Sequence, residues 1–135
     1  MEIRALDHVA MVVEDLDQAV ATYERLFAAE VEHREQLEEQ GVEAAMLRVG
    51  TGRIELIAPV REDTGVARFL AKRGPGMHHV AVEVGDVGTA LAELEDAGAS
   101  LVDAAPRRGL GGHEVAFVHP ESVHGVLVEV VSHGR

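Results

Sequence analysis

One short pattern occurs twice in this chain, and it constrains the fold more than any other feature. LDHVAMVV begins at Leu6 and MHHVAVEV begins at Met77, and each places a histidine, His8 or His79, at the same position of an otherwise aliphatic strand. Burying an imidazole without a polar partner costs free energy. Two histidines in matched positions therefore predict a partner that they share.

The rest of the chain repeats in the same way, which predicts two similar halves. Asp15 and Asp86 follow the two histidines at one constant offset, and GRIELIAP and GVLVEVVS are similar strands that carry Glu55 and Glu129. Alternation and helical periodicity predict a βαβββ order in each half. The expected strands cover about residues 6–13, 31–37, 42–49, 53–58, 77–84, 100–103, 114–118 and 125–131.

These elements predict an α+β fold of two tandem βαβββ modules related by pseudo-twofold symmetry. Module one covers about residues 4–58, a linker helix about 63–74, and module two about 76–132, all within one domain of residues 1–135, a length that suits one compact domain. Asp15, Thr64 and Asp86 are the expected N-caps of the three helices. The first helix is expected to bury the face formed by Leu16, Val20, Tyr23 and Phe27, with Ala19 and Leu26 beside it.

Four strands share a pattern in which one face is aliphatic and the other carries a single metal-binding group. These groups are His8, Glu55, His79 and Glu129. A single strand histidine is more often structural, but the pseudo-symmetry brings all four inner faces around one point. Two imidazoles and two carboxylates suit a divalent cation such as Co²⁺, Mn²⁺, Ni²⁺, Fe²⁺ or Zn²⁺, with positions left open for a substrate.

Composition excludes several classes of partner. The net charge is −12 and aromatic residues make up 3% of the chain, which argues against nucleic acid and anionic membranes as partners. There is no cysteine, so thiolate chemistry and disulfides are excluded. No apolar run approaches the ~20 residues of a transmembrane helix, and the first residues do not resemble a signal peptide. The expected location is the cytoplasm.

Longer segments resemble the methylmalonyl-CoA epimerase family of the vicinal oxygen chelate (glyoxalase/bleomycin resistance) superfamily. They are EEQGVEAAMLRVG, IELIAPVREDTGVARFLAKRGPGMHHVAVEV and PRRGLGGHEVAFVHPESVHGVLVEV. The resemblance implies a curved sheet around a metal-binding cup, Co²⁺ as the usual ion, an acyl-CoA substrate and a homodimer. The implied reaction interconverts (2R)- and (2S)-methylmalonyl-CoA by proton transfer through a metal-stabilised enolate, although ethylmalonyl-CoA stays open as a substrate.

The resemblance also implies roles for individual residues. Glu129 is the candidate for both metal ligand and catalytic base. Some family members carry a second catalytic glutamate at the position of Ala44, whereas this chain has Glu43 one residue earlier. A shift of one residue turns a side chain to the other face of a strand. Either a bulge turns Glu43 inward, or another group or a water serves as the second acid–base group.

The candidate substrate contacts lie near the expected mouth of the cup. Basic residues that could meet the CoA phosphates are Lys72, Arg73, Arg107 and Arg108, and Gly111, Gly112 and His113 belong to a loop whose backbone can approach a ligand closely. His78 is expected to be structural. His33, His119, His124 and His133 have no matched counterpart and are expected at the surface or in loops.

Two other functions fit the same fold. A glyoxalase I-type lactoylglutathione lyase uses the same ligand types for a proton transfer. A non-catalytic drug-binding protein related to the bleomycin resistance proteins would use the cup without needing four metal ligands.

Overall fold

The computed structural model describes residues 1–134, which form two compact units. The terminal unit comprises Met1–His8 and the described residues from His79 onward, and the central unit comprises Val9–His78. The first strand, β1 (Ile3–Val12), begins in the terminal unit and ends in the central unit, and β5 (Gly76–Val84) passes from the central unit into the terminal unit. Each unit is described by itself below.

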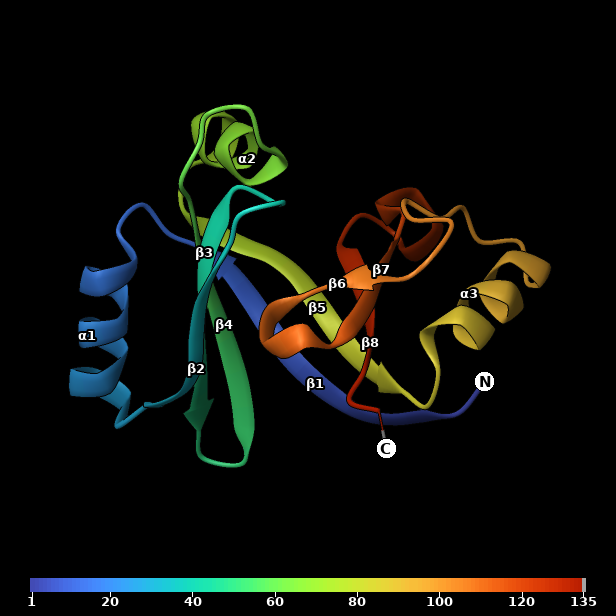
Figure 1. Cartoon of the computed structure of the whole chain (residues 1–135), viewed down its shortest axis with the longest axis horizontal. Helices are drawn as coiled ribbons and strands as arrows, with labels where there is room; N and C mark the ends of the chain where they lie inside the picture. The colour runs from blue at the N-terminus through green and yellow to red at the C-terminus, as the bar shows by residue number, and fades with distance from the viewer. Residues whose placement is uncertain (135) are drawn as a thin grey trace. The chain divides into compact units, whose positions relative to one another are not determined.

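The central unit contains the strands β2, β3 and β4 and the end of β1, in the order β2-β3-β4-β1 (Figure 1). The strands cover Glu30–Leu37 (β2), Val42–Val49 (β3) and Gly52–Pro59 (β4). β2, β3 and β4 pair antiparallel, whereas β1 pairs parallel with β4. A parallel pair needs a crossover connection, and the segment from α1 to β3 supplies it.

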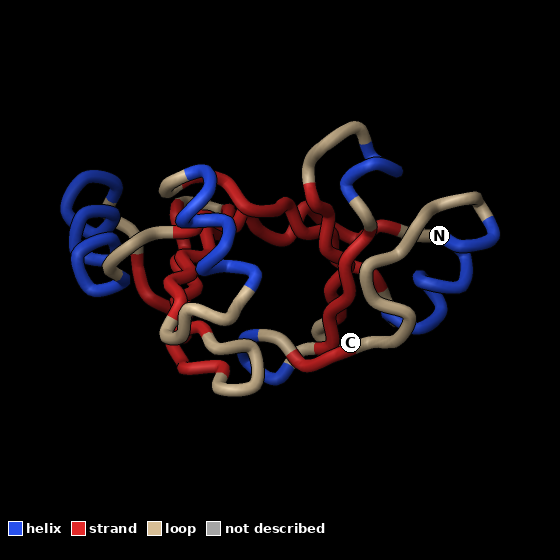
Figure 2. Tube along the Cα trace, turned by 90° about the horizontal axis from the view of Figure 1, so that it is seen from above, coloured by secondary structure: helices blue, strands red, loops and turns tan. Residues whose placement is uncertain are grey.

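The helix α1 (Leu16–Phe27) covers one face of these strands, as seen from above in Figure 2. Asp15 caps the helix as predicted, because its side chain accepts a hydrogen bond from the Gln18 N–H at 3.0 Å. Leu16 and Val20 are buried against Leu47 and Leu56, which have no exposed surface. The aliphatic faces predicted for β1 and β4 therefore pack on the helix.

The predicted burial of the last turn of α1 is wrong. Leu26 is 60% exposed and Phe27 is 56% exposed. Tyr23 already covers the edge of the core, since it packs on the buried cluster and its hydroxyl donates to the Met11 sulfur at 3.2 Å. Phe27 lies on the outer side of the Tyr23 ring, with 5.7 Å between the ring centroids.

The helix α2 (Gly65–Arg73) follows β4 in the central unit. Thr64 caps it, as predicted, by accepting a hydrogen bond from the Ala67 N–H at 3.0 Å, and Gly74 ends it with a positive φ of 73°. The Phe69 ring of α2 contacts the His78 ring edge-on at 5.2 Å. The structural role expected for His78 stays a prediction.

The terminal unit repeats the same order of elements. Its strands follow the order β5-β8-β7-β6, with the bounds Arg107–Arg108 (β6), Glu114–Val118 (β7) and Leu127–Ser132 (β8). β5 pairs parallel with β8, and the other pairs are antiparallel. The helix α3 (Val87–Asp96) packs Val87, Ala90 and Leu91 against Val84 and Val130. Asp86 caps α3, as predicted, by accepting from the Thr89 N–H at 2.8 Å. Short 3₁₀ turns cover Leu110–Gly112 and Pro120–Val123.

One predicted strand, residues 100–103, does not form. Of these residues, Leu101 alone makes an isolated bridge, to Val118. The Asp103 carboxylate accepts the hydrogen bond of the Phe117 N–H at 2.8 Å and so takes the place of a backbone acceptor. A short polar side chain that bonds to the backbone competes with sheet formation in this way. β6 pairs with the other end of β7, at Glu114 and Val115.

The registers of the two parallel pairs are equivalent, which confirms the internal repeat and the α+β fold. Ala10, two residues after His8, lies opposite Glu55 in β4. Ala81, two residues after His79, lies opposite Glu129 in β8. The division into one domain with the module boundaries given above stays a prediction. Among residues 1–134, none of the helices is long and apolar enough to cross a membrane.

We predict that Leu47→Ala lowers the free energy of unfolding by about 2–5 kcal/mol, because it opens a cavity in the central core. The control is Leu26→Ala, the same deletion at a side chain that is 60% exposed, which should change stability by less than about 0.5 kcal/mol. Urea denaturation of both variants measures the difference. Equal losses would mean that Leu26 is buried.

Candidate metal centre

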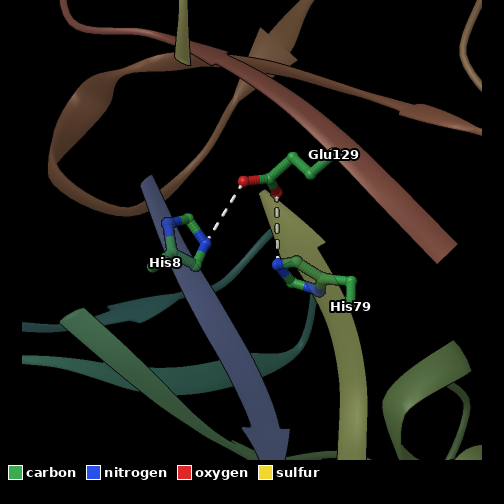
Figure 3. A group of neighbouring side chains, drawn as sticks. All are labelled: His8, His79 and Glu129. Carbon is green, nitrogen blue, oxygen red and sulfur yellow. Dashed lines mark ion pairs between the residues drawn. The ribbon is translucent and has the colours of Figure 1, made fainter. Parts of the chain in front are cut away.

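His8, His79 and Glu129 lie together in the terminal unit, where all three side chains are buried (Figure 3). Their ligand atoms lie within 4.8 Å of one another. The two oxygens of Glu129 face one imidazole each: Oε1 is 3.4 Å from His8 Nε2, and Oε2 is 3.6 Å from His79 Nε2. The structure therefore brings together three of the four ligands that the sequence predicts.

Strand geometry explains why Glu129 and His79 meet. Side chains alternate across a strand, so His79 and Ala81 share one face of β5. The register places Glu129 opposite Ala81, on that same face. The opposite face of both strands carries Val82, Val84 and Val130, which pack against α3. Slipping the pairing by one residue would bury Glu129 under the helix and lose the site.

The hydrogen bond on the far side of the His8 ring determines what His8 offers to Glu129. His8 Nδ1 lies 2.7 Å from Asp7 Oδ2, which assigns the Nδ1 proton to this hydrogen bond. A neutral ring then directs the Nε2 lone pair at the Glu129 carboxylate. The Nε2 lone pair and the carboxylate oxygen repel each other unless a proton or a cation lies between them. A carboxylate behind the imidazole is the usual support of a metal-binding histidine.

The donor set fits a divalent cation. Two imidazole nitrogens and one carboxylate, all buried, match the ligands that Zn²⁺, Co²⁺ and similar ions take in proteins. Aromatic edges hold the rings in place: the His8 and His79 centroids are 5.5 Å apart, and the Phe117 ring meets His79 at 5.1 Å. The three residues form a candidate His/Glu metal site.

Asp7 is a charged group in a buried position. Burial raises its pKa, but the hydrogen bonds from His8 and His133, together with the positive charge that either imidazole carries when it is protonated, lower it by more, to about 2. His133 Nε2 lies 2.6 Å from Asp7 Oδ1. Asp7 therefore stays ionised and accepts a hydrogen bond on each oxygen.

Glu55 belongs to the central unit and is not part of this group of three. It is 7% exposed on β4, where it lies opposite Ala10 on one side and Met46 on the other. Its position in the central unit is equivalent to that of Glu129 in the terminal unit. Its role as a fourth ligand stays a prediction.

Glu43 lies on the face of the sheet that α1 covers. The ladder between β3 and β4 is continuous from Val42 to Val49, and it pairs Glu43 with Ala58 in the central core. Ala44 and Met46 lie on the other face, which also carries Glu55. No bulge interrupts β3 in this ladder. The structure therefore does not support the alternative in which a bulge turns Glu43 inward.

The predicted substrate contacts fall in both units. Lys72 and Arg73 form the last turn of α2 in the central unit, and the Arg73 guanidinium lies over Phe69. In the terminal unit, Arg107 and Arg108 form β6, and the Arg107 guanidinium lies 5.1 Å from the centroid of Phe117, the ring that contacts His79. Gly111 and Gly112 both have positive φ, in the turn that leads to His113.

Sequence reasoning missed Asp7 and the contact that His133 makes with it. Asp7 precedes His8, but the matching residue before His79 is His78, and this break in the repeat was the available signal. His133 lies after the end of β8, which agrees with the expected surface or loop position, but its side chain is only 20% exposed and contacts Asp7. Nothing in the local pattern indicates that contact, because the two residues are 126 positions apart.

We predict that Asp7→Asn destabilises the protein in a pH-dependent way. A group whose pKa falls from 3.8 to about 2 on folding stabilises the folded state above about pH 4, and this contribution is lost as the pH falls towards 2. The stability difference between wild type and Asp7→Asn should therefore shrink over this range. Urea denaturation of chelator-treated protein at several pH values measures it, and a difference that grows at low pH would contradict the assignment.

The sequence matches a known protein superfamily and individual relatives over most of its length. Residues 7–117 match the glyoxalase/bleomycin resistance protein/dioxygenase superfamily. An ethylmalonyl-CoA/methylmalonyl-CoA epimerase of Cereibacter sphaeroides is 36% identical over 130 residues, which cover 95% of this chain and 97% of the relative. The mitochondrial methylmalonyl-CoA epimerase of Bos taurus is 36% identical over 126 residues, with 93% and 72% covered.

A solved structure of a methylmalonyl-CoA epimerase in complex with methylmalonyl-CoA and NH₄⁺ superimposes with a TM-score of 0.93 at 39% identity. The match covers 97% of this chain and 95% of that one. Fold and sequence thus agree over nearly the whole length. The chain belongs to the glyoxalase/bleomycin resistance protein/dioxygenase superfamily and, within it, to the methylmalonyl-CoA epimerase family.

Proposed function

We propose that this protein is a metal-dependent methylmalonyl-CoA epimerase that interconverts the (2R) and (2S) forms of its substrate. The observation that carries the proposal is the buried group of His8, His79 and Glu129. Relatives that cover nearly the whole chain are epimerases of methylmalonyl-CoA, and one of them is also named for ethylmalonyl-CoA. An acyl-CoA with an acidic α-hydrogen is therefore the proposed substrate.

His8, His79 and Glu129 would hold the cation, with Glu55 as the proposed fourth ligand and Co²⁺ as the proposed ion. When bound, the cation would stabilise the negative charge that develops on the thioester oxygen as the α-proton leaves. The hydrogen bond from His8 Nδ1 to Asp7 keeps the His8 Nε2 lone pair available for binding. The Phe117 ring packs edge-on against His79 and helps to hold this ring in place.

Glu129 is also the proposed acid–base group. Its carboxylate is buried and can accept the α-proton from one face of the substrate. Epimerisation then requires that a proton is returned to the opposite face, so a second acid–base group is needed. Glu43 faces the α1 side of the central unit, and we therefore assign the second role to another group or to a water.

The CoA phosphates are the proposed partners of the basic residues Lys72, Arg73, Arg107 and Arg108. Within the terminal unit, Arg107 stacks on Phe117 and so lies one ring away from His79. Gly111 and Gly112 adopt positive φ values that side chains with a Cβ rarely adopt, and we propose the turn that they form before His113 as a substrate contact. We also propose that the protein forms a homodimer and is located in the cytoplasm.

The activity is tested by proton exchange. With Co²⁺ and (2R)-methylmalonyl-CoA in D₂O, we expect the α-hydrogen to be replaced by deuterium while the (2S) form accumulates, both followed by NMR. Ethylmalonyl-CoA in a parallel reaction tests the width of the substrate class. Absence of exchange with metal present, or formation of lactoylglutathione from methylglyoxal and glutathione, would contradict the proposal.

A second prediction separates the roles of the two buried glutamates. Glu129→Gln should reduce exchange by at least about 10²-fold, because an amide cannot accept the α-proton. Glu55→Gln should retain most of the activity, because an amide oxygen can still bind a cation and Glu55 is proposed as a ligand only. Exchange rates at saturating Co²⁺ measure both. Equal losses in the two variants would remove the acid–base role from Glu129.

A further inference from the structure

A chain of four polar side chains extends from the candidate metal centre through the terminal unit. His8 Nδ1 lies 2.7 Å from Asp7 Oδ2, and Asp7 Oδ1 lies 2.6 Å from His133 Nε2. His133 Nδ1 lies 3.3 Å from His113 Nε2, and the two rings meet edge-on with centroids 4.4 Å apart. Asp7 thus stands between two imidazoles, one of them a proposed metal ligand.

The backbone around His133 holds it in place. Ser132, the last residue of β8, is 8% exposed, and its hydroxyl donates to the Gly85 carbonyl at 2.9 Å and accepts from the Gly134 N–H at 3.2 Å. Glu83, 5% exposed, lies close to both Asp7 and His133. His113 is the last of the four polar side chains. Its backbone carbonyl accepts a hydrogen bond from the Gly109 N–H at 2.8 Å, which closes the glycine-rich turn.

This arrangement decides how firmly Asp7 can orient His8. A buried carboxylate with one bonded oxygen can rotate about its Cβ–Cγ bond, whereas bonds on both oxygens fix its plane. A fixed carboxylate assigns the proton of His8 to Nδ1 and sets the direction of Nε2, which faces Glu129 at 3.4 Å. Such support behind a metal-binding histidine typically changes metal affinity by about 10–100-fold.

We propose that His133 is a positioning residue of the metal centre, which acts on His8 through Asp7. His113 extends this support to the glycine-rich turn at residues 109–112. The inference rests on the proposed function in that it takes His8 as a metal ligand. The residue before His79 is His78, so the aspartate that supports His8 has no counterpart at this position of the repeat.

The first test measures Co²⁺ binding to the chelator-stripped full chain by calorimetry. His133→Phe keeps a ring but loses the donor to Asp7, and it should bind Co²⁺ about 10–100-fold more weakly. His133→Gln keeps an N–H donor and should stay within about 5-fold of wild type. The matched control is His33→Phe, which removes an exposed histidine of the central unit and should leave the affinity unchanged.

Unchanged affinity in His133→Phe, or an equal loss in the Phe and Gln variants, would overturn the proposal. Failure of the wild type itself to bind Co²⁺ would refute the proposed function, a result distinct from failure of the His133 variants alone.

The second test needs no metal. Histidine ¹⁵N NMR of the stripped protein should show the Nδ1–H tautomer of His8 in the wild type and a mixture of tautomers in His133→Phe. If His133 were only structural, His133→Phe would lower the unfolding midpoint and leave the His8 tautomer unchanged, and that result would overturn the proposal.

Discussion

The placement of one buried carboxylate between two buried imidazoles is the constraint on which the terminal unit depends. Glu129 faces His8 and His79 at 3.4 and 3.6 Å, with all three side chains at least nine-tenths buried. Such a group is stable when a proton or a cation neutralises it. The sheet register, the aliphatic packing beneath it and the hydrogen bonds behind His8 all serve to hold these three side chains in one orientation.

The two units use the same topology for this purpose. In each, a strand crosses over through a helix and returns parallel to its starting strand, so that a glutamate lies opposite the alanine two residues after a histidine. The helix covers one face of the strands and leaves the other for polar groups. The repeat thereby provides similar positions twice.

The surroundings of the two imidazoles differ although their positions match. His8 has Asp7 behind it, and Asp7 is held in turn by His133. His79 has the edge of Phe117, on which Arg107 stacks. The His8 ring thus contacts a carboxylate, and the His79 ring adjoins an aromatic ring that separates it from a guanidinium.

The sequence alone determined the order of elements, the helix caps and the candidate ligands, because these depend on periodicity and local hydrogen bonds. Asp15, Thr64 and Asp86 cap the helices as predicted, and the alternation around His79 and Glu129 assigned their faces. The tertiary structure decided what depends on distant contacts. Tyr23 excludes Phe27 from the core, Asp103 replaces a strand with a side-chain hydrogen bond, and His133 reaches Asp7 across 126 positions. Local patterns carry no information about such contacts, because their free energy arises only once the chain has folded.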